Sequence, residues 1–265
     1  MKLALGAPEM SVYRLLQFTD PHLFADRAGE MRGVRTLDTL MATISTAQQQ
    51  HFPADAVLVS GDIAQDESRG AYRLFRECFA SLGLPVFCLP GNHDAPAYMQ
   101  ELLTEDPFYY CGSITLGDWL IPMLNTNNPG DAGGMLEKDE LDGLSRLLAA
   151  SRDKNVLICM HHHPISSGSR WLDTVPLRNA AELWAIVEQY SNVRCMLWGH
   201  VHQAYESRQN GMLLLATPST CRQFLPEVHY FALDEDSPPA YRWLDLHPDG
   251  TIVSAIKWCG TKETS

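Results

Sequence analysis

The chain has 265 residues, and its 20 lysines and arginines against 32 aspartates and glutamates give a formal net charge of −12. This acidic balance argues against a surface that binds nucleic-acid polymers or anionic membranes, and taken alone it also disfavours an enzyme that handles phosphate anions. The absence of low-complexity runs excludes a mostly disordered chain, and the length suits one large domain with a sizeable core.

The N-terminal segment MKLALGAPEM has few apolar residues before Gly6 and Pro8. It is too short for a signal peptide or a membrane span, so we expect a flexible segment over residues 1–10 and a single domain over 11–260. The seven cysteines include no C-x-x-C pair. They predict free thiols in a reducing compartment, and hence a cytoplasmic protein. For the oligomeric state, a monomer and a homodimer both stay open.

Hydrophobic patterning predicts alternating strands and helices over the first two-thirds of the chain. In chain order we expect a strand at 12–18, a helix at 37–49, a strand at 55–60, a helix at 71–82, a strand at 85–89, a helix at 96–103, a hairpin at 113–124, a helix at 137–151, a strand at 156–160, a helix at 178–190 and a strand at 193–198. Residues 205–258 alternate strand-like runs with turn signals. This order predicts helices that cover largely parallel sheets, with antiparallel pairs added by the tail.

Metal-binding residue types follow five of the predicted buried strands. In chain order these residues are Asp20 and His22, then Asp62, then Asn92, His93 and Asp94, then His161, His162 and His163, and finally His200 and His202. Seven of the ten histidines lie in these motifs. Because ligand crevices form at the carboxyl ends of strands in open α/β sheets, the motifs predict one shared site.

The five motifs together predict a metal centre, although each alone is also compatible with an ordinary turn or helix cap. One catalytic ion needs three or four protein ligands, and at least seven candidates are present. We therefore expect two divalent ions that share a bridging aspartate. Imidazole with carboxylate favours Fe²⁺ or Mn²⁺, with Zn²⁺ as a further candidate, and the absence of cysteine from the motifs argues against a structural zinc site.

The order D-x-H, G-D, G-N-H-D, H-H-x-P, G-H-x-H resembles the signature of calcineurin-like metallophosphoesterases, over Asp20 to His202. More narrowly, the chain resembles bacterial class III 3′,5′-cyclic AMP phosphodiesterases. The stretches that carry this resemblance are 19–24, 61–66, 89–94, 161–173, 177–183 and 214–224. The resemblance implies an α/β fold of the α+β type, a four-layer αββα sandwich of two mixed β-sheets flanked by helices, with a dinuclear site at one edge.

Residue by residue, the resemblance implies two sets of metal ligands. One ion is expected on Asp20, His22, Asp62 and His202, and the other on Asp62, Asn92, His161 and His200, with Asp62 bridging. On a strand His161 and His163 point one way and His162 the other, and the H-H-x-P alignment favours His161. His162 and His163 are then expected to support the ligands or to pack.

The expected reaction is hydrolysis of 3′,5′-cyclic AMP to 5′-AMP by a hydroxide held between two ions about 3.5–4 Å apart. Asp62, Asn92 and His93 are the predicted catalytic residues. His93 is expected to stabilise the transition state or to protonate the leaving oxygen, or else only to orient a ligand. Asp94 is expected either to cap the helix that begins near residue 96 or to orient His93.

Substrate contacts are expected from His22, Asp62, Asn92, His93, His161 and His202 at the phosphate and from Trp171, Arg178 and Asn179 at the nucleotide. Trp171 is a candidate for stacking on adenine and Arg178 for a phosphate oxygen. The alternatives are that Trp171 packs in a loop and that Arg178 begins a helix. Ser219, Thr220 and Arg222 are further candidates.

The expected partner is a small cyclic nucleotide, without a nucleic-acid polymer or a membrane. One alternative is a broader phosphodiesterase that acts on 2′,3′-cyclic nucleotides or glycerophosphodiesters. Another is a non-catalytic scaffold, although no motif position is substituted. A P-loop NTPase is disfavoured because no Gly-Lys pair occurs, and the HEXXH zinc-protease motif is missing.

Overall fold

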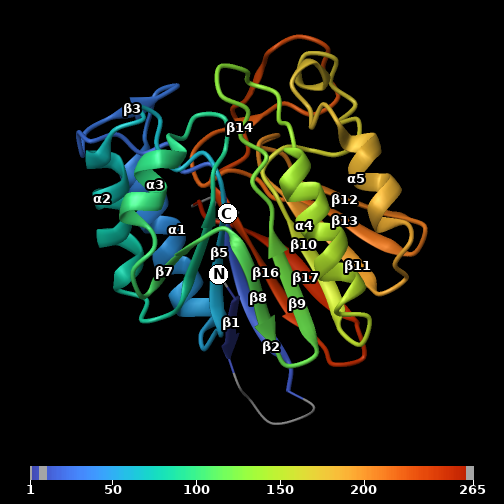
Figure 1. Cartoon of the computed structure of the whole chain (residues 1–265). Coiled ribbons are helices and arrows are strands. Elements are labelled where there is room, and N and C mark those ends of the chain that lie inside the picture. Colours follow the sequence, from blue (N-terminus) through green and yellow to red (C-terminus); the bar gives the residue numbers. More distant parts are fainter. Residues whose placement is uncertain (1, 6–10, 261–265) are drawn as a thin grey trace, which may run out of the picture.

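The structure is a computed structural model that describes residues 2–5 and 11–260. In this part of the chain, two large mixed β-sheets lie face to face in the middle of the molecule and helices cover their outer faces (Figure 1). The α/β sandwich that the resemblance implied is therefore confirmed.

One sheet has six strands, of which four neighbours run parallel. In spatial order they are β17 (Ile252–Trp258), β16 (Ala240–Leu246), β2 (Tyr13–Phe18), β5 (Ala56–Ser60), β6 (Val86–Leu89) and β7 (Phe108–Tyr110). Strands β2, β5, β6 and β7 are parallel, while β16 is antiparallel to both of its neighbours. The tail thus adds the antiparallel pairs that its turn signals predicted.

The other sheet has seven strands. In spatial order they are β1 (Lys2–Leu5), β8 (Gly112–Leu116), β9 (Trp119–Met123), β10 (Asn155–Cys159), β11 (Val193–Trp198), β13 (Met212–Ala216) and β12 (Tyr205–Gln209). Strands β9, β10, β11 and β13 are parallel, and β8 and β9 form the predicted hairpin. Two short two-stranded ribbons pair β3 (Glu30–Met31) with β4 (Val34–Arg35) and β14 (Gln223–Phe224) with β15 (Leu233–Asp234).

The helices lie on the two opposite outer faces of the sandwich (Figure 1). Three helices cover the six-stranded sheet: α1 (Thr36–His51), α2 (Arg69–Ala80) and α3 (Pro96–Leu102). Two helices cover the seven-stranded sheet: α4 (Lys138–Ala149) and α5 (Ala180–Val187). A 3₁₀ turn, η1 (Leu172–Thr174), lies between β10 and α5.

Burial on both faces of the central strands explains the continuous apolar runs in the sequence. In β2, Leu15 belongs to the apolar cluster between the two sheets, whereas Leu16 and Phe18 belong to the cluster under α1 and α2. A third apolar cluster lies between the seven-stranded sheet and helices α4 and α5. Three apolar layers between four layers of secondary structure place the strand ends, and the loops that follow them, at the edge of the sandwich.

Strands β3, β4 and β7 were not predicted from the sequence, and two predicted segments differ from the structure. Residues 2–5, which the sequence assigns to a flexible segment, form the edge strand β1, which pairs in parallel with β8; residues 1 and 6–10 of that segment lie outside the described residues. Helix α5 is shorter than the predicted 178–190, because Asn179 occupies its N-cap position and the helix ends at Val187.

The structure also bears on the cysteines and on membrane insertion. All seven cysteines are free thiols, as the sequence predicts. Among the described residues, every helix is too short or too polar to cross a lipid bilayer.

Candidate metal centre

The loops after β2, β5, β6, β10 and β11 meet at one edge of the sandwich, as predicted. Backbone hydrogen bonds join these loops: the amides of Asp20 and His22 donate to the carbonyls of Gly61 and Asp62 at 3.0 Å. The amide of Gly199 donates to the carbonyl of His161 at 3.2 Å. The carboxylate and imidazole groups from these loops are buried, so they face one another rather than water.

The backbone at these positions adopts a conformation that L-residues rarely take. Five predicted ligands have a positive φ, between 47° and 66°: Asp20, His22, Asp62, His200 and His202. Such conformations cost about 1–3 kcal/mol each and persist only where the surrounding structure enforces them, which is common at functional sites. Here they turn successive side chains toward the same point after each strand.

A first group of donors consists of Asp20, His22 and His202, all buried. Nε2 of His202 lies 3.2 Å from Oδ1 of Asp20 and 3.2 Å from Nε2 of His22. Oδ2 of Asp62 lies 3.8 Å from Nε2 of His22. These four residues are the set that the resemblance assigned to one ion.

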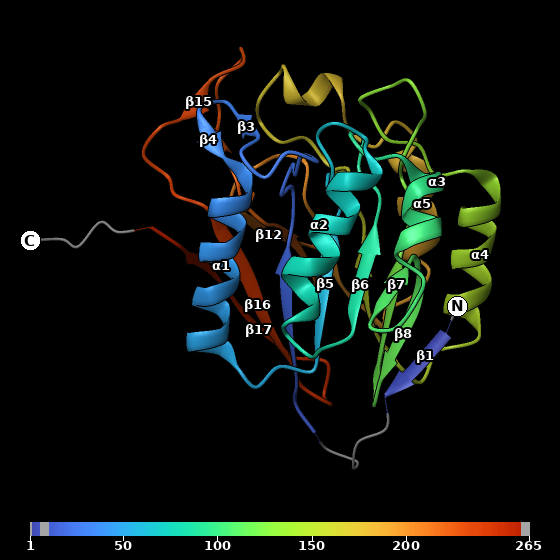
Figure 2. The same ribbon diagram turned by 90° about the vertical axis from the view of Figure 1, so that its left-hand side faces the viewer.

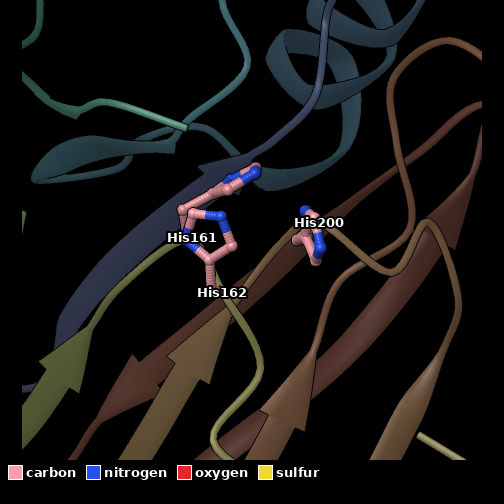
Figure 3. Close-up of side chains that lie close together, drawn as sticks. All are labelled: His161, His162 and His200. Carbon is pink, nitrogen blue, oxygen red and sulfur yellow. The ribbon is translucent and has the colours of Figure 1, made fainter. Parts of the chain in front are cut away.

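A second group surrounds His161. Its Nε2 lies 3.4 Å from Oδ2 of Asp62 and 3.3 Å from Oδ1 of Asn92. The His200 ring centroid lies 5.0 Å from that of His161, and Figure 3 shows these two rings beside His162. Asp62 therefore adjoins both groups, as a bridging ligand would.

Backbone carbonyls hold the rings of His161 and His202 and fix which nitrogen faces the centre. Nδ1 of His161 donates to the carbonyl of Ser60 at 2.7 Å, and Nδ1 of His202 donates to that of Arg222 at 2.6 Å. In both rings the opposite nitrogen, Nε2, faces the carboxylates. Such hydrogen bonds orient metal-ligating histidines in proteins, and the donor set of carboxylates, imidazoles and one amide oxygen suits first-row divalent cations.

The protonation states make the centre strongly ionic. Burial by itself would raise the pKa of Asp20, but His202 outweighs it and lowers that pKa to about 2. His161 likewise holds the pKa of Asp62 well below its ordinary value, despite burial. Burial lowers the pKa of His22 to about 4. Burial by itself would lower the pKa of His161, but Asp62 outweighs it and raises that pKa to about 9. Two buried carboxylates therefore lie among imidazoles whose pKa values are shifted in opposite directions.

His162 and His163 lie beside the two donor groups, and the ring nitrogens of His162 come close to those of His161 and His200. Both ring nitrogens of His162 are engaged, Nδ1 by the hydroxyl of Thr126 at 2.8 Å and Nε2 by the carbonyl of Ala132 at 3.2 Å. The ring of His163 stacks on that of His200, with centroids 5.5 Å apart and 18° between the planes. The structure thus gives both residues packing contacts of the kind that the sequence suggested.

His93 lies half-buried at the wall of the cavity next to this centre. Its amide donates to Oδ1 of Asp62 at 2.8 Å, and its ring centroid lies 5.2 Å from that of His22. Nδ1 of His93 lies 3.4 Å from Nε2 of Gln65. The imidazole therefore borders the first group of donors and reaches the cavity.

The structure contradicts both interpretations of Asp94. Helix α3 begins after Ala95 without a side-chain cap, so Asp94 is not its N-cap. Its buried carboxylate accepts hydrogen bonds from the amides of Ile63, Ala64 and Gly91 and from the hydroxyl of Tyr72. Asp94 therefore joins the loop after β5 to the loop after β6, and the described hydrogen bonds include none from it to the His93 ring.

A cavity of about 720 Å³ opens onto the centre, and its lining includes Trp171. Arg178 and Asn179 are not part of this lining. The Arg178 guanidinium forms a two-pronged ion pair with Asp131, at 2.7 and 2.6 Å. The Asn179 side chain pairs with the backbone of Leu136. Of the three predicted nucleotide contacts, the structure brings only Trp171 to the cavity.

Ser219, Thr220 and Arg222 also lie outside the cavity lining and contact the ligand loops instead. The Ser219 hydroxyl donates to the carbonyl of Asp20 at 2.7 Å, and the Thr220 amide donates to the carbonyl of Thr19 at 3.0 Å. The Arg222 carbonyl holds His202, as described above. These residues contact the loops that carry the predicted ligands and do not line the space for a substrate.

Several residues of the site are not among the candidates that the sequence predicts. The Thr19 hydroxyl donates to Oδ2 of Asp20 at 2.6 Å. The outer wall of the cavity includes the side chains of Phe24, Arg32, Phe224 and Phe231. Isolated phenylalanines and arginines in loops are common, so only their meeting in space marks these four residues.

A family model described as "Calcineurin-like phosphoesterase" matches residues 13–204. The chain belongs to this family. Among its curated relatives, the 3′,5′-cyclic adenosine monophosphate phosphodiesterase CpdA of Haemophilus influenzae is 38% identical over 250 residues, which cover 94% of this chain and 91% of the relative. The protein of the same name from Pseudomonas aeruginosa is 37% identical, over 91% of this chain and 88% of the relative.

Solved structures of other proteins share the fold of this chain. A dimetal phosphatase from Danio rerio superposes with a TM-score of 0.65 at 15% identity, covering 94% of this chain and 99% of that one. A purple acid phosphatase from yellow lupin seeds gives a TM-score of 0.63 at 15% identity, covering 97% of this chain and 58% of the other.

Proposed function

We propose that this protein hydrolyses 3′,5′-cyclic AMP to 5′-AMP at a dinuclear metal centre. The observation that carries the proposal is the meeting of seven donor residues beside one cavity: Asp20, His22, Asp62, Asn92, His161, His200 and His202. The names of the curated relatives supply the substrate.

The donor residues divide between two ions in the way that the distances suggest. Asp20, His22 and His202 would hold one ion, Asn92, His161 and His200 would hold the other, and Asp62 would contribute to both. When bound, two divalent cations clamp the phosphoryl oxygens and lower the pKa of bound water so that hydroxide is present at neutral pH. Fe²⁺ and Mn²⁺ are the proposed occupants, with Zn²⁺ as a third, because imidazole and carboxylate suit all three.

The chain itself supplies a proton donor near the leaving group. His93 borders the donor groups and lines the cavity, and its backbone is fixed by the hydrogen bond to Asp62. A protonated imidazole at this position donates to the 3′ oxygen as its bond to phosphorus breaks. We assign His93 this role of general acid.

Trp171 is the proposed nucleotide contact. Its ring lies edge-on to Phe224 and Phe231, with centroids 5.1 and 5.2 Å away, so an aromatic wall faces the cavity. A purine stacks favourably on such a wall. The seven free thiols support a reducing, cytoplasmic location.

The test measures product formation by the purified protein loaded with Mn²⁺ or Fe²⁺. The substrates are 3′,5′-cyclic AMP, 3′,5′-cyclic GMP, 2′,3′-cyclic AMP and a glycerophosphodiester. We expect 5′-AMP from 3′,5′-cyclic AMP at the highest kcat/KM. The exposed residue Asp249 provides a matched control, because Asp249→Asn should keep this activity while Asp62→Asn should abolish it.

Two outcomes would contradict the proposal. A preference for 2′,3′-cyclic nucleotides or glycerophosphodiesters would indicate the broader phosphodiesterase instead. No turnover of any diester, together with fewer than one bound metal ion per chain, would indicate a non-catalytic scaffold.

A further inference from the structure

The outer rim of the cavity is built from two segments that are far apart in the sequence. The β3–β4 hairpin contributes Arg32, and the segment that follows β14 contributes Phe231. Figure 2 shows β3, β4 and β15 at the same end of the molecule. The Arg222 guanidinium joins the two segments, because its Nε donates to the carbonyl of Arg32 at 3.1 Å.

A series of rings leads outward from a metal ligand to Arg32. Phe224 stacks on His202, with centroids 4.2 Å apart and 15° between the planes. Phe231 follows at 5.4 Å from Phe224, and the Arg32 guanidinium lies 4.9 Å from the Phe231 ring centroid. Trp171 touches both phenylalanines. The wall is therefore continuous from the phosphate end of the cavity to its rim.

Arg32 adds a positive charge to the wall of the cavity. Arg32 is the only lysine or arginine among the described residues that line the cavity, and within the described ranges its guanidinium has no carboxylate partner. Two neighbouring arginines are paired: Arg35 with Asp38 at 3.2 Å, and Arg222 with Glu235 at 2.9 Å. One face of the Arg32 guanidinium thus rests on the Phe231 ring, and the N–H groups in the guanidinium plane stay available to a ligand.

The chemistry of a nucleotide fits this arrangement. With the phosphate at the metal centre, the base extends away from it along the aromatic wall. A guanidinium that stacks on an aromatic ring still donates in its own plane, and the ring nitrogens of a purine accept such hydrogen bonds. Resting on the proposed function, we infer that Arg32, held on Phe231, binds the nucleobase of the substrate and is a specificity-determining residue of this site.

The test compares Arg32→Ala with Arg35→Ala, a matched control on the same hairpin that does not line the cavity. For Arg32→Ala we expect the KM for 3′,5′-cyclic AMP to rise about 10-fold, the loss expected for one hydrogen bond from a charged donor, with a smaller change in kcat. Arg35→Ala should keep the wild-type KM. An unchanged KM in Arg32→Ala, or a loss confined to kcat, would overturn the inference.

A second measurement is independent of cyclic AMP hydrolysis. With bis(4-nitrophenyl) phosphate as the reporter substrate, inhibition constants are determined for 5′-AMP and ribose 5-phosphate, which differ only in the base. Arg32→Ala should weaken inhibition by 5′-AMP about 10-fold more than inhibition by ribose 5-phosphate. Equal weakening of both would contradict base recognition. If the wild-type protein cleaves the reporter but not cyclic AMP, the proposed function fails while this ratio still tests Arg32.

Discussion

Asp62 shows how individual residues build the centre. The backbone amide of His93 donates to Oδ1 of Asp62 at 2.8 Å. Oδ2 of Asp62 then faces Nε2 of His161 at 3.4 Å and Nε2 of His22 at 3.8 Å. A Cβ on Gly91 would lie 2.1 Å from that Oδ1, so only glycine fits there. One carboxylate can therefore adjoin both donor groups because its other oxygen is fixed by the backbone.

The substitution Asn92→Ala should lower activity by at least about 100-fold, because it removes the amide oxygen that lies 3.3 Å from Nε2 of His161. Asn92 is only partly buried, so the fold should persist. Steady-state kinetics and circular dichroism of the variant check these two expectations. Wild-type turnover in Asn92→Ala would contradict the assignment of Asn92 as a ligand.

The substitution His93→Ala should lower kcat by about 10²–10⁴-fold, the usual contribution of a general acid, and should spare metal binding. Metal content by mass spectrometry and kcat at several pH values are the measurements. Loss of metal in this variant would show instead that His93 holds or orients an ion.

At the scale of elements, the centre depends on how the strand-end loops are joined. Asp94, in the loop after β6, accepts amide hydrogen bonds from Ile63 and Ala64 in the loop after β5. The Tyr72 hydroxyl, on α2, donates to the same carboxylate at 3.0 Å. One buried side chain thus ties two loops and a helix together.

The substitution Asp94→Ala should destabilise the protein by roughly 3–5 kcal/mol, since each buried group left without a partner costs about 1–3 kcal/mol. The matched control is Tyr72→Phe, which removes only the hydroxyl and should cost about 1 kcal/mol. Urea denaturation of both variants gives the free energies of unfolding. A cost for Asp94→Ala no larger than that for Tyr72→Phe would argue against this joining role.

At the scale of the whole molecule, the net charge of −12 is compatible with a phosphodiester substrate. Asp20 and Asp62 contribute to that charge, yet both are buried in the proposed metal centre. Two divalent ions would add about +4 at this one place. The field that a bound phosphate meets would then be set by the centre rather than by the net charge of the chain.

Removal of the metals with a chelator should lower Tm by roughly 5–10 °C. An ion present at 100 times its dissociation constant stabilises the folded state by about 2.7 kcal/mol, and each kcal/mol shifts Tm by about 2–4 °C at this chain length. Thermal unfolding with and without Mn²⁺ checks this. The Asp62→Asn variant should show a much smaller shift, and an equal shift would mean that the ions bind elsewhere.

The sequence by itself determined the order of elements and the motifs. Apolar runs with breaks at Gly61, Gly91 and Gly199 predicted the central strands, and the polar residues that follow each strand predicted the donor set. Both signals are local, because strand period and turn chemistry depend on neighbouring residues. The helices were predicted to within a few residues for the same reason.

Only the tertiary structure decided which loop residues meet. Arg178 pairs with Asp131, and Arg32 lies against Phe231, across separations of 47 and roughly 200 residues that no local pattern encodes. The same holds for the carbonyls that orient His161 and His202. Local periodicity places a residue at the end of a strand, but its partner depends on how the two sheets pack.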